Sequence, residues 1–507
     1  MAVDWTRVPV LIGAGQVTNR VEDPATSPDP FALMEEATRL AAHAAHDRRG
    51  GGLIRSLTHL WMVHSLSLRH GDPAAELARR LGADTATSRC SGMGGSVPQW
   101  LVNRAAELVV AGDRPRVLIA GAEALATRRR AKAAGLRLDW PTSEGWPDTW
   151  PPIEPDVGVH PVERANGLDQ ATTMYALVES ALAHAAGQTP EEHTRTMGVL
   201  MAGLNAVAAG NPHAWFRTLR SAAELVTVTP DNRMVNLPYP KYCNAVMDVD
   251  MGAAGIVTDA RTARDLGLDP ADIAYLTGWA DAHEVWNLSA RPAVHRAPAL
   301  EACGATALAM AGTSLDELGA FDLYACFPSS IEVARDSLGI APDDPRPLTL
   351  TGGLPSAGGP GSNAVTHAIA NALDWLRAGR GHATLVQGNG YYLTKQALGV
   401  YTNHPPTSNP EPVPGLQDRL DAGARPLEIV PSPSGGATVV AATVPYGRDG
   451  EPGAGIVLVD LDGTPGRRSV ARADPVLTAA LVAGDPVGQG VTITPGEGGG
   501  PNCAAPA

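Results

Sequence analysis

A chain of 507 residues is too long for one ordinary domain and long enough to bury a large core. Its 53 acidic and 39 basic residues give a formal charge of -14, which argues against a general nucleic-acid surface and against broad contact with anionic membranes. The five cysteines have no metal-type spacing and indicate free thiols in a reducing compartment. There is no long apolar run and no secretion-type start, so we expect no membrane span and a cytoplasmic location.

Strand-like and helical patterns alternate along the first part of the chain. Val8–Val17 is an apolar run interrupted by glycines, and Asp29–Asp47 then places apolar residues at helical spacing. Similar patterns continue to residue 126, which predicts a layered α/β architecture around a mainly parallel sheet. Between Thr127 and Val235 the alternation stops, and helices mix with loops rich in proline and tryptophan. We interpret this stretch as an insertion laid over the first sheet, where it would serve as a lid.

The alternation then resumes and gives a second α/β half whose glycines match those of the first. In the first half Gly112 closes a helix and Gly121 ends the next strand, nine residues later. In the second half Gly379 and Gly388 have the same spacing, 267 residues further along the chain, and Gly92 matches Gly359 at this offset. Two glycine-rich turns, SGMGG and GGPGS, therefore precede equivalent helices. A duplicated fold brings these helix starts together, and their free N–H groups suit a thioester or enolate oxygen. The alternative is that the glycines only allow strand and helix to pack closely.

The C-terminal part of the chain differs in composition from the rest. It follows a proline-rich stretch and consists of short β-rich segments split by glycine and charged turns, which predicts a small β-barrel similar to an OB-fold. The predicted division is residues 1–265 for the first half with its insertion at 127–235, 266–402 for the second half, 403–414 for a linker, 415–493 for the barrel and 494–507 for a flexible tail.

Several segments of the body resemble the thiolase superfamily. They are the two α/β halves, the insertion after the strand ending IAGAEAL, and the segments DMGAAGIV, LYACF and TGGLPSAGGP, which together extend from about Val8 to Thr402. The branch linked to sterol carrier protein is the most similar, in particular its bacterial members with an extra C-terminal barrel. The resemblance implies a duplicated thiolase fold, with two βαβαβαββ halves in an αβαβα arrangement. It also implies coenzyme A thioesters as substrates, with one cysteine acylated, a second acting as acid and base, and histidine and asparagine in oxyanion holes.

The turn that holds the nucleophile in this family is altered here. The family has Cys-x-Ser-Gly, whereas this chain reads RCSGMGG. If Gly94 and the next glycine align with the Ser-Gly pair, the nucleophile position is Gly92 and Cys90 lies two residues upstream. A thiol near a helix start is stabilised as thiolate, so Cys90 is a candidate nucleophile, and the alternative is a small buried apolar residue. Gly92 and Gly94 are candidate substrate-binding residues.

The family's Gly-His-Pro motif has lost its histidine. Gly358, Gly359 and Pro360 stand at its three positions, and we expect them to bind substrate. His367 lies eight residues further along the predicted helix. It is a candidate for proton transfer in place of the missing imidazole, with a purely structural histidine as the alternative.

Two further motifs keep some of their polar groups. VQGNG matches the family's Cys-x-Gly with valine at the cysteine position, and it retains Asn389 as a polar group. YACF matches His-Asp-Cys-Phe, with Tyr324 at the histidine position and Cys326 retained. Cys326 at a predicted strand end is the better thiol candidate, and Tyr324 can donate its phenol proton to a carbonyl oxygen or move a proton. The alternatives are a core cysteine and a half-buried strand aromatic.

The resemblance gives the functional prediction. We expect a thiolase-type acyltransferase on acyl-CoA in which Cys326 or Cys90 is the nucleophile and Arg128 and Arg129 pair with phosphates, unless these arginines only form a solvated face. One alternative is a thiolase-fold retro-aldolase on β-hydroxyacyl-CoA, and another is a protein that binds acyl-CoA without turnover. We expect no permanently bound cofactor, no metal, no nucleic-acid partner and, as thiolases usually form, a homodimer.

Overall fold

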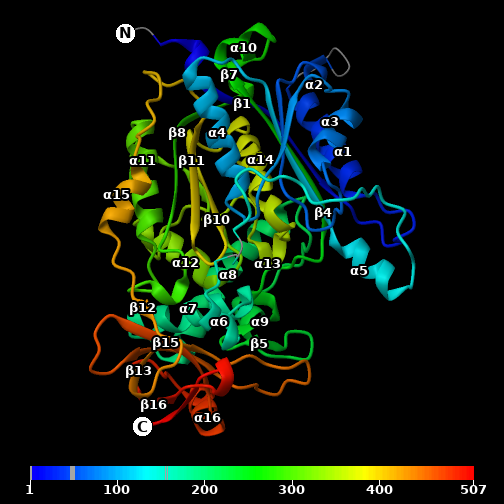
Figure 1. Cartoon of the computed structure of the whole chain (residues 1–507). Helices are drawn as coiled ribbons and strands as arrows, with labels where there is room; N and C mark the ends of the chain where they lie inside the picture. Colours follow the sequence, from blue (N-terminus) through cyan, green and yellow to red (C-terminus); the bar gives the residue numbers. More distant parts are fainter. Residues whose placement is uncertain (1–2, 46–51, 155, 157) are drawn as a thin grey trace.

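The computed structural model describes residues 3–45, 52–154, 156 and 158–507, so the last residues of the helix predicted over Asp29–Asp47 lie outside the described part. The body is built on a nine-stranded sheet with the order β3-β2-β4-β7-β1-β8-β11-β10-β9 (Figure 1). Its strands are β1 (Pro9–Thr18), β2 (His59–Met62), β3 (Thr87–Cys90), β4 (Val117–Ala124), β7 (Asp250–Asp259), β8 (Ala274–His283), β9 (Ala320–Asp322), β10 (Ala383–Gly390) and β11 (Lys395–Thr402).

The sheet consists of two similar halves. The first half has the strand order β3-β2-β4-β7-β1, and the second half continues the sheet with the order β8-β11-β10-β9. A short pairing between β1 and β8, which includes Val10 and Tyr275, joins the two halves. The strands of the second half occupy positions equivalent to those of the first, in reverse order. Helices α4 (Val97–Ala111) and α14 (Ala364–Arg377) start at the predicted offset of 267 residues. The duplicated fold is therefore confirmed.

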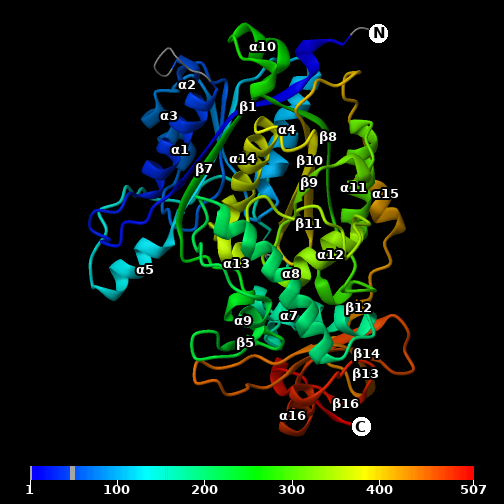
Figure 2. The ribbon, with the colours of Figure 1, turned by 180° about the vertical axis from the view of Figure 1, so that it is seen from behind.

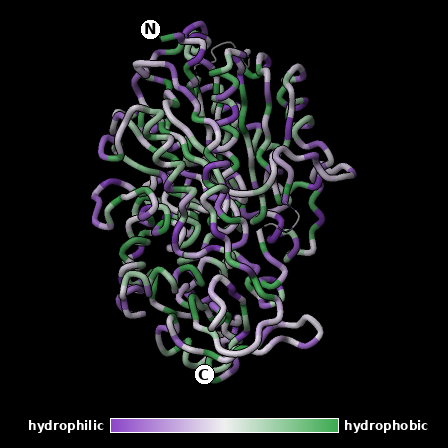
Figure 3. The backbone as a smooth tube through the Cα atoms, turned by 60° about the vertical axis from the view of Figure 1, so that its left-hand side comes forward, coloured by the Kyte–Doolittle hydropathy of each residue, from purple (hydrophilic) through white to green (hydrophobic). Residues whose placement is uncertain are grey.

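Helices cover both halves and fill the space between them (Figures 1 and 2). α1 (Pro30–Ala44) and α3 (Pro73–Leu81) pack on the outer face of the first half, and α11 (Pro298–Ala311) packs on β8 and β11 of the second. α4 and α14 lie in the middle and contact strands of both halves, which completes the predicted αβαβα layers. Hydrophobic and hydrophilic stretches alternate along the chain, and several outer loops are hydrophilic (Figure 3).

The sheet is mixed, so the prediction of a mainly parallel sheet was wrong. β2–β3, β2–β4 and β9–β10 pair in parallel. The other five pairings are antiparallel, including the β10–β11 hairpin and the long β1–β7 and β4–β7 ladders. Apolar runs identify buried strands but carry no information on the direction of the neighbouring strand.

The insertion packs elsewhere than predicted. It contains α5 (Leu125–Ala133), α6 (Pro161–Ala165), α7 (Ala171–Ala185), α8 (Pro190–Gly210) and α9 (Ala222–Val226), and the hairpin β5 (Met234–Asn236) and β6 (Tyr239–Pro240) follows it. Helices α7 and α8 contact α12 (Pro328–Ser337) of the second half, and α8 contacts α13 (Leu354–Ala357). Helices α7, α8 and α9 thus lie between the second half and the C-terminal domain (Figure 1). The loop of the insertion around Thr149 instead packs on the first half, where Thr149 bridges to Cys90 of β3.

The C-terminal domain is a closed five-stranded barrel, as predicted. Its ring runs β13-β14-β15-β17-β16 and back to β13, and α16 (Pro475–Ala483) connects β15 to β16, in keeping with an OB-like arrangement. The strands are β13 (Gly435–Thr443), β14 (Ile456–Leu461), β15 (Arg467–Ala473), β16 (Gly490–Thr494) and β17 (Cys503–Pro506), with β12 (Glu428–Ile429) beside β15.

Two boundaries of this domain differ from the prediction. The stretch 494–507 was predicted to be a flexible tail, but its strand β17 pairs with both β15 and β16 and closes the barrel. α15 (Leu416–Gly423) packs against α11 and β8, so the barrel strands begin only at residue 428. Among the described residues, no helix combines the length and the apolar character needed to span a bilayer.

Candidate active site

The two matched glycine-rich turns meet at the N-terminal ends of α4 and α14. The amide N–H of Gly94 donates to Ser362 Oγ over 3.1 Å, which joins the start of one central helix to the start of the other. This contact confirms that the duplicated turns converge. The ends of β9 and β10 reach the same region, because Gly388 of β10 lies against Ser96.

Tyr324 and Lys395 occupy the space beside this turn. A Cβ built at Gly95 would lie 2.4 Å from Cζ and Oη of Tyr324, and one at Gly94 would lie 3.3 Å from Cε of Lys395. Gly94 also has φ +127°, which favours glycine. The turn is therefore built from glycines because two side chains of the second half fill the volume that side chains of the turn would need.

Among the candidate catalytic residues predicted from the sequence, Tyr324 is the one that is half-buried, whereas Cys90, Cys326, His367 and Asn389 are buried. Tyr324 follows β9, where its backbone N–H donates to Gln387 Oε1 over 2.8 Å. Its oxygen makes no hydrogen bond within the described part of the chain. Burial raises the pKa of Tyr324, and the nearby Cys326 adds to the rise, so the group is a phenol that can donate a hydrogen bond.

Cys326 and Asn389 are brought together by Tyr175, a residue of α7 that sequence reasoning missed. Asn389 Nδ2 donates to the Tyr175 oxygen over 2.9 Å, and the Tyr175 hydroxyl donates to the carbonyl of Tyr391 over 2.9 Å. The thiol of Cys326 is within hydrogen-bonding reach of the same phenol. Burial raises the pKa of Cys326 to about 11, although hydrogen bonds from Ser330 and Tyr175 oppose the rise. The thiol is thus protonated at neutral pH, and no histidine accompanies it among the groups that shift its pKa.

Cys90 is placed apart from this group. It ends β3 in a buried position, and its carbonyl accepts a hydrogen bond from Trp150 N over 2.9 Å. Burial raises the pKa of Cys90 to about 12. A Cβ at Gly92 would lie 2.6 Å from the carbonyl oxygen of Pro151. The loop around residues 149–152 therefore covers Gly92, and the assignment of Gly92 to the family's nucleophile position stays a prediction.

The residues at the altered histidine motif do not rebuild an acid-base group. Gly359 packs beside Leu354, and the next residue, Pro360, is buried. Gly358 has φ +98°, which explains glycine there. His367 of α14 bonds Gln16 of β1 over 2.9 Å, and burial lowers its pKa to about 3, with a smaller effect from His213. His367 is thus a neutral imidazole held against β1, and within the described part of the chain no hydrogen bond joins it to either candidate thiol.

Lys395 is the second residue that sequence reasoning missed. Its Nζ donates to the Met93 carbonyl over 2.8 Å and lies 4.2 Å from the centre of the Tyr391 ring. Burial lowers the pKa of Lys395 to about 8, although the charge of Glu154 opposes the shift. The sequence feature that could have identified Lys395 is its position as a lone lysine shortly after the glycine-rich VQGNG segment.

The two arginines predicted to bind phosphates lie on the exposed face of α5. Arg128 donates to the carbonyl of Leu66 over 2.9 Å, and Arg129 pairs with Asp248 at 3.1 Å. Both side chains are at the surface, and α5 projects from the edge of the first half (Figure 2). Their role in phosphate binding stays a prediction.

Comparison with solved structures gives a match over the full length. The crystal structure of a monomeric SCP2-thiolase-like protein type 1 from Mycobacterium smegmatis shares 32% identity, with 100% of both chains covered and a TM-score of 0.85. The chain belongs to the SCP2-thiolase-like branch of the thiolase superfamily. No known family model and no curated protein sequence matches it.

Other thiolase-superfamily structures share the fold at lower identity. An Ltp2-ChsH2(DUF35) aldolase has 18% identity and a TM-score of 0.59 over 78% of this chain and 98% of that chain. Human mitochondrial 3-ketoacyl-CoA thiolase in complex with CoA has 14% identity and a TM-score of 0.54 over 80% of this chain and 100% of that chain. The SCP2-thiolase-like chain described here thus keeps the thiolase architecture with an altered set of polar groups.

Proposed function

We propose that this SCP2-thiolase-like protein is a carbon–carbon lyase that cleaves β-hydroxyacyl-CoA by a retro-aldol reaction. The observation that carries the proposal is the placement of the Lys395 amine and the Tyr324 phenol beside consecutive glycines of the thiolase turn. The Lys395 amine can accept a proton and the Tyr324 phenol can donate a hydrogen bond. A retro-aldol step requires both of these functions.

The proposed step uses both groups at once. The neutral amine of Lys395 removes the proton of the β-hydroxyl group, the bond between the α and β carbons breaks, and its electron pair forms the thioester enolate. The Tyr324 hydroxyl stabilises the enolate oxygen by donating a hydrogen bond to it. Protonation at the α carbon then gives a shortened acyl-CoA and an aldehyde or ketone. With a pKa of about 8, roughly a quarter of Lys395 is neutral at pH 7.5.

The predicted acyltransferase reaction has less support in this geometry. It requires a thiolate, and burial keeps both Cys90 and Cys326 protonated at neutral pH. His367, the candidate base, bonds Gln16 instead. Covalent acyl transfer stays a prediction, and so does acyl-CoA binding without turnover. One structural neighbour is named as an aldolase, which adds only that the fold accommodates such chemistry.

The test is turnover of a panel of β-hydroxyacyl-CoAs of increasing chain length, with the shortened acyl-CoA measured by mass spectrometry. We expect Lys395→Met to lower kcat by about 10²–10⁴ and Tyr324→Phe by about 10²–10³. Lys241→Met, which changes an exposed lysine, is the matched control. Intact-protein mass after incubation with acetyl-CoA is recorded in parallel. An acyl adduct on Cys326 without any cleavage would overturn the proposal in favour of acyl transfer.

The predicted homodimer is a separate question. The relative that matches over the full length is described as monomeric. We therefore propose that this chain is a monomer and not the dimer predicted from its sequence. Light scattering on the purified protein distinguishes a 52.5 kDa monomer from a particle of twice that mass.

A further inference from the structure

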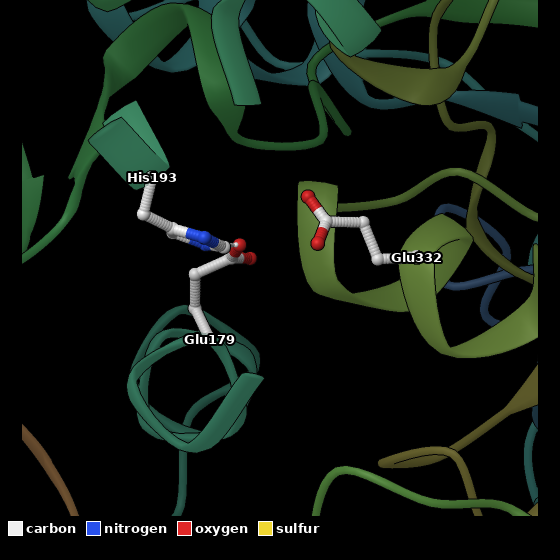
Figure 4. Close-up of side chains that lie close together, drawn as sticks. All are labelled: Glu179, His193 and Glu332. Carbon is white, nitrogen blue, oxygen red and sulfur yellow. Dashed lines mark hydrogen bonds and ion pairs between the residues drawn. The ribbon is translucent and has the colours of Figure 1, made fainter. Parts of the chain in front are cut away.

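Three ionisable side chains from three helices meet in the interior beside the barrel. They are Glu179 of α7, His193 of α8 and Glu332 of α12, and their side chains point toward one another (Figure 4). One possible ligand atom from each lies within 4.8 Å of the others, and the three residues are 0%, 3% and 4% exposed. Two carboxyl groups and an imidazole at such depth are costly unless something compensates their charge.

Hydrogen bonds define how the imidazole faces Glu179. Gln188 Oε1 lies 2.8 Å from His193 Nδ1, so a proton on Nδ1 satisfies that contact. In this tautomer Nε2 presents a lone pair to Glu179 Oε1, its close neighbour. The other Glu179 oxygen accepts a hydrogen bond from the Tyr239 hydroxyl. Two acceptor atoms therefore face each other at hydrogen-bond contact, so a proton lies between them unless they move apart and a metal ion replaces it.

Glu332 distinguishes these two possibilities. Its Oε1 is buried and has no hydrogen-bond partner in the described part of the structure. Figure 4 shows its carboxyl group directed at the Glu179–His193 pair. A proton shared by Glu179 and His193 satisfies only that pair. A divalent cation at the centre accepts ligands from all three residues and leaves no buried oxygen unpaired.

We propose that Glu179, His193 and Glu332 bind a divalent transition-metal ion, for which zinc is the best match. One imidazole nitrogen and two carboxylate oxygens are borderline-to-hard ligands, and their two negative charges balance the ion. Ligand atoms about 2 Å from a tetrahedral zinc lie about 3.3 Å apart. Binding therefore requires the His193 imidazole and the Glu179 carboxylate to move apart from their present hydrogen-bonded contact, and the Glu332 carboxylate to rotate toward them. Hydrogen bonds hold two of the ligands in place, because Tyr239 donates to Glu179 and Gln188 bonds His193 Nδ1. Outer hydrogen-bond partners of this kind orient the ligands in metal sites.

A cavity provides a route to this site. It has a volume of about 150 Å³ and lies between the helical insertion and the barrel, where Glu179 and His193 form part of its wall together with Val444 and Leu481. A water molecule from this side would supply the fourth ligand. Phe327 stacks on Tyr175, whose hydroxyl belongs to the Cys326 group, and on Tyr239, whose hydroxyl bonds Glu179. The ion therefore connects α7, α8 and α12 and stabilises the insertion on the second half, independently of the proposed lyase reaction.

The experiment uses the full chain without a histidine tag, treated with a chelator and then titrated with Zn²⁺ by calorimetry and with Co²⁺ by visible absorption. We expect one ion per chain and a higher Tm with zinc. Glu332→Gln and His193→Gln should each weaken binding by at least about 100-fold, and Tyr239→Phe by about 10-fold. Glu191→Gln is the control, since it removes an exposed carboxylate that lines the same cavity.

Glu332→Gln keeps the size of the side chain and removes an unpaired buried acid, so it should fold even if His193→Gln does not. Loss of the stoichiometric site in Glu332→Gln, with the site retained in Glu191→Gln, supports the proposal. Absence of stoichiometric binding to the wild-type chain would overturn it and leave a proton between Glu179 and His193. Unchanged zinc affinity in Glu332→Gln would overturn it as well, because the ion would then lie elsewhere.

Discussion

Lys395 and Tyr324 face two consecutive glycines, so that a methyl group at either glycine would contact one of the two side chains. The closer approach is that of Tyr324, 2.4 Å from a Cβ at Gly95, compared with 3.3 Å for Lys395 and Gly94. The two residues reach the turn from different directions, Tyr324 after β9 and Lys395 at the start of β11. The absence of side chains at 94 and 95 therefore leaves room for an amine beside one glycine and a phenol beside the next.

Gly95→Ala should displace Tyr324. The added methyl group overlaps the phenol ring, which has to move, and overpacking of this kind costs about 1–3 kcal/mol in the free energy of unfolding. Thermal or urea unfolding measures the cost, and cleavage of β-hydroxyacyl-CoA should fall together with the stability. Gly203→Ala is the control, because nothing lies within 4 Å of a Cβ at that position on α8, and it should be neutral or slightly stabilising. Equal behaviour of the two variants would contradict the placement of Tyr324.

The amine of Lys395 should titrate well below the other lysines. Its pKa of about 8, lowered by burial from 10.5, makes it the neutral form in mildly alkaline solution. Reductive methylation with ¹³C-formaldehyde followed by NMR should give a dimethyl-lysine resonance that titrates near pH 8. Lys132 and Lys241 are exposed, and comparison with the Lys395→Met variant identifies which resonance belongs to Lys395. A Lys395 resonance that does not shift between about pH 7 and 9 would contradict the lowered pKa.

The same shift predicts how stability depends on pH. Because the pKa of Lys395 is lower in the folded chain than in the unfolded chain, the folded state binds fewer protons between about pH 8 and 10.5. The contribution of this group to the free energy of unfolding therefore rises with pH across that window, and below pH 8 the buried ammonium is a cost. Lys395→Met removes the cost, which is on the order of 3 kcal/mol for a shift of this size. We expect the variant to exceed the wild type in stability at pH 7 and to lose that advantage by pH 10.5.

Thiol reactivity tests whether the active-site cysteines are nucleophiles. Cys90, Cys243, Cys303 and Cys326 are buried, whereas Cys503 is exposed on β17. Burial raises the pKa values of the first four, so they should react slowly with Ellman's reagent in the native protein. We expect about one fast thiol per native chain, lost in Cys503→Ser, and five after denaturation. A fast thiol that persists in Cys503→Ser and disappears in Cys326→Ala would favour the acyltransferase prediction.

Much of the fold was predictable because it repeats. The matching glycines, Gly92 with Gly359, lie ahead of helices that start at the same offset, and a duplicated pattern of this kind survives in a single sequence. Strand direction was not predictable, since an apolar run such as β1 looks the same beside a parallel or an antiparallel neighbour. The position of the insertion was missed for a similar reason, because its amphipathic helices do not specify which half they cover.

The site was predictable where the chain retains family motifs. Tyr324, Cys326 and Asn389 came from such motifs and lie in one cluster. Tyr175 was missed because it belongs to the inserted helix α7, outside every motif. Lys395 was missed because it lies on the next strand, across the hairpin from Gly390. The Glu179, His193 and Glu332 cluster could not be predicted from spacing, because its members lie on three helices that only the tertiary fold brings together.

The last strand of the chain should be essential to the barrel, in contrast to the flexible tail predicted from composition. Removal of residues 495–507 deletes β17 and exposes the edges of β15 and β16 that it covers, so we expect loss of cooperative unfolding of this domain. A milder variant, Asn502→Ala, removes buried hydrogen bonds, including that from Asn502 Nδ2 to the Val470 carbonyl at 3.0 Å. It should cost about 1–3 kcal/mol in the free energy of unfolding, whereas Pro501→Ala at the exposed neighbouring position should have little effect. A strand held by hydrogen bonds on both sides cannot lose them without a measurable cost in stability. If the melting curves of the Asn502→Ala and Pro501→Ala variants both coincide with that of the wild type, the segment contributes nothing to stability and the prediction is wrong.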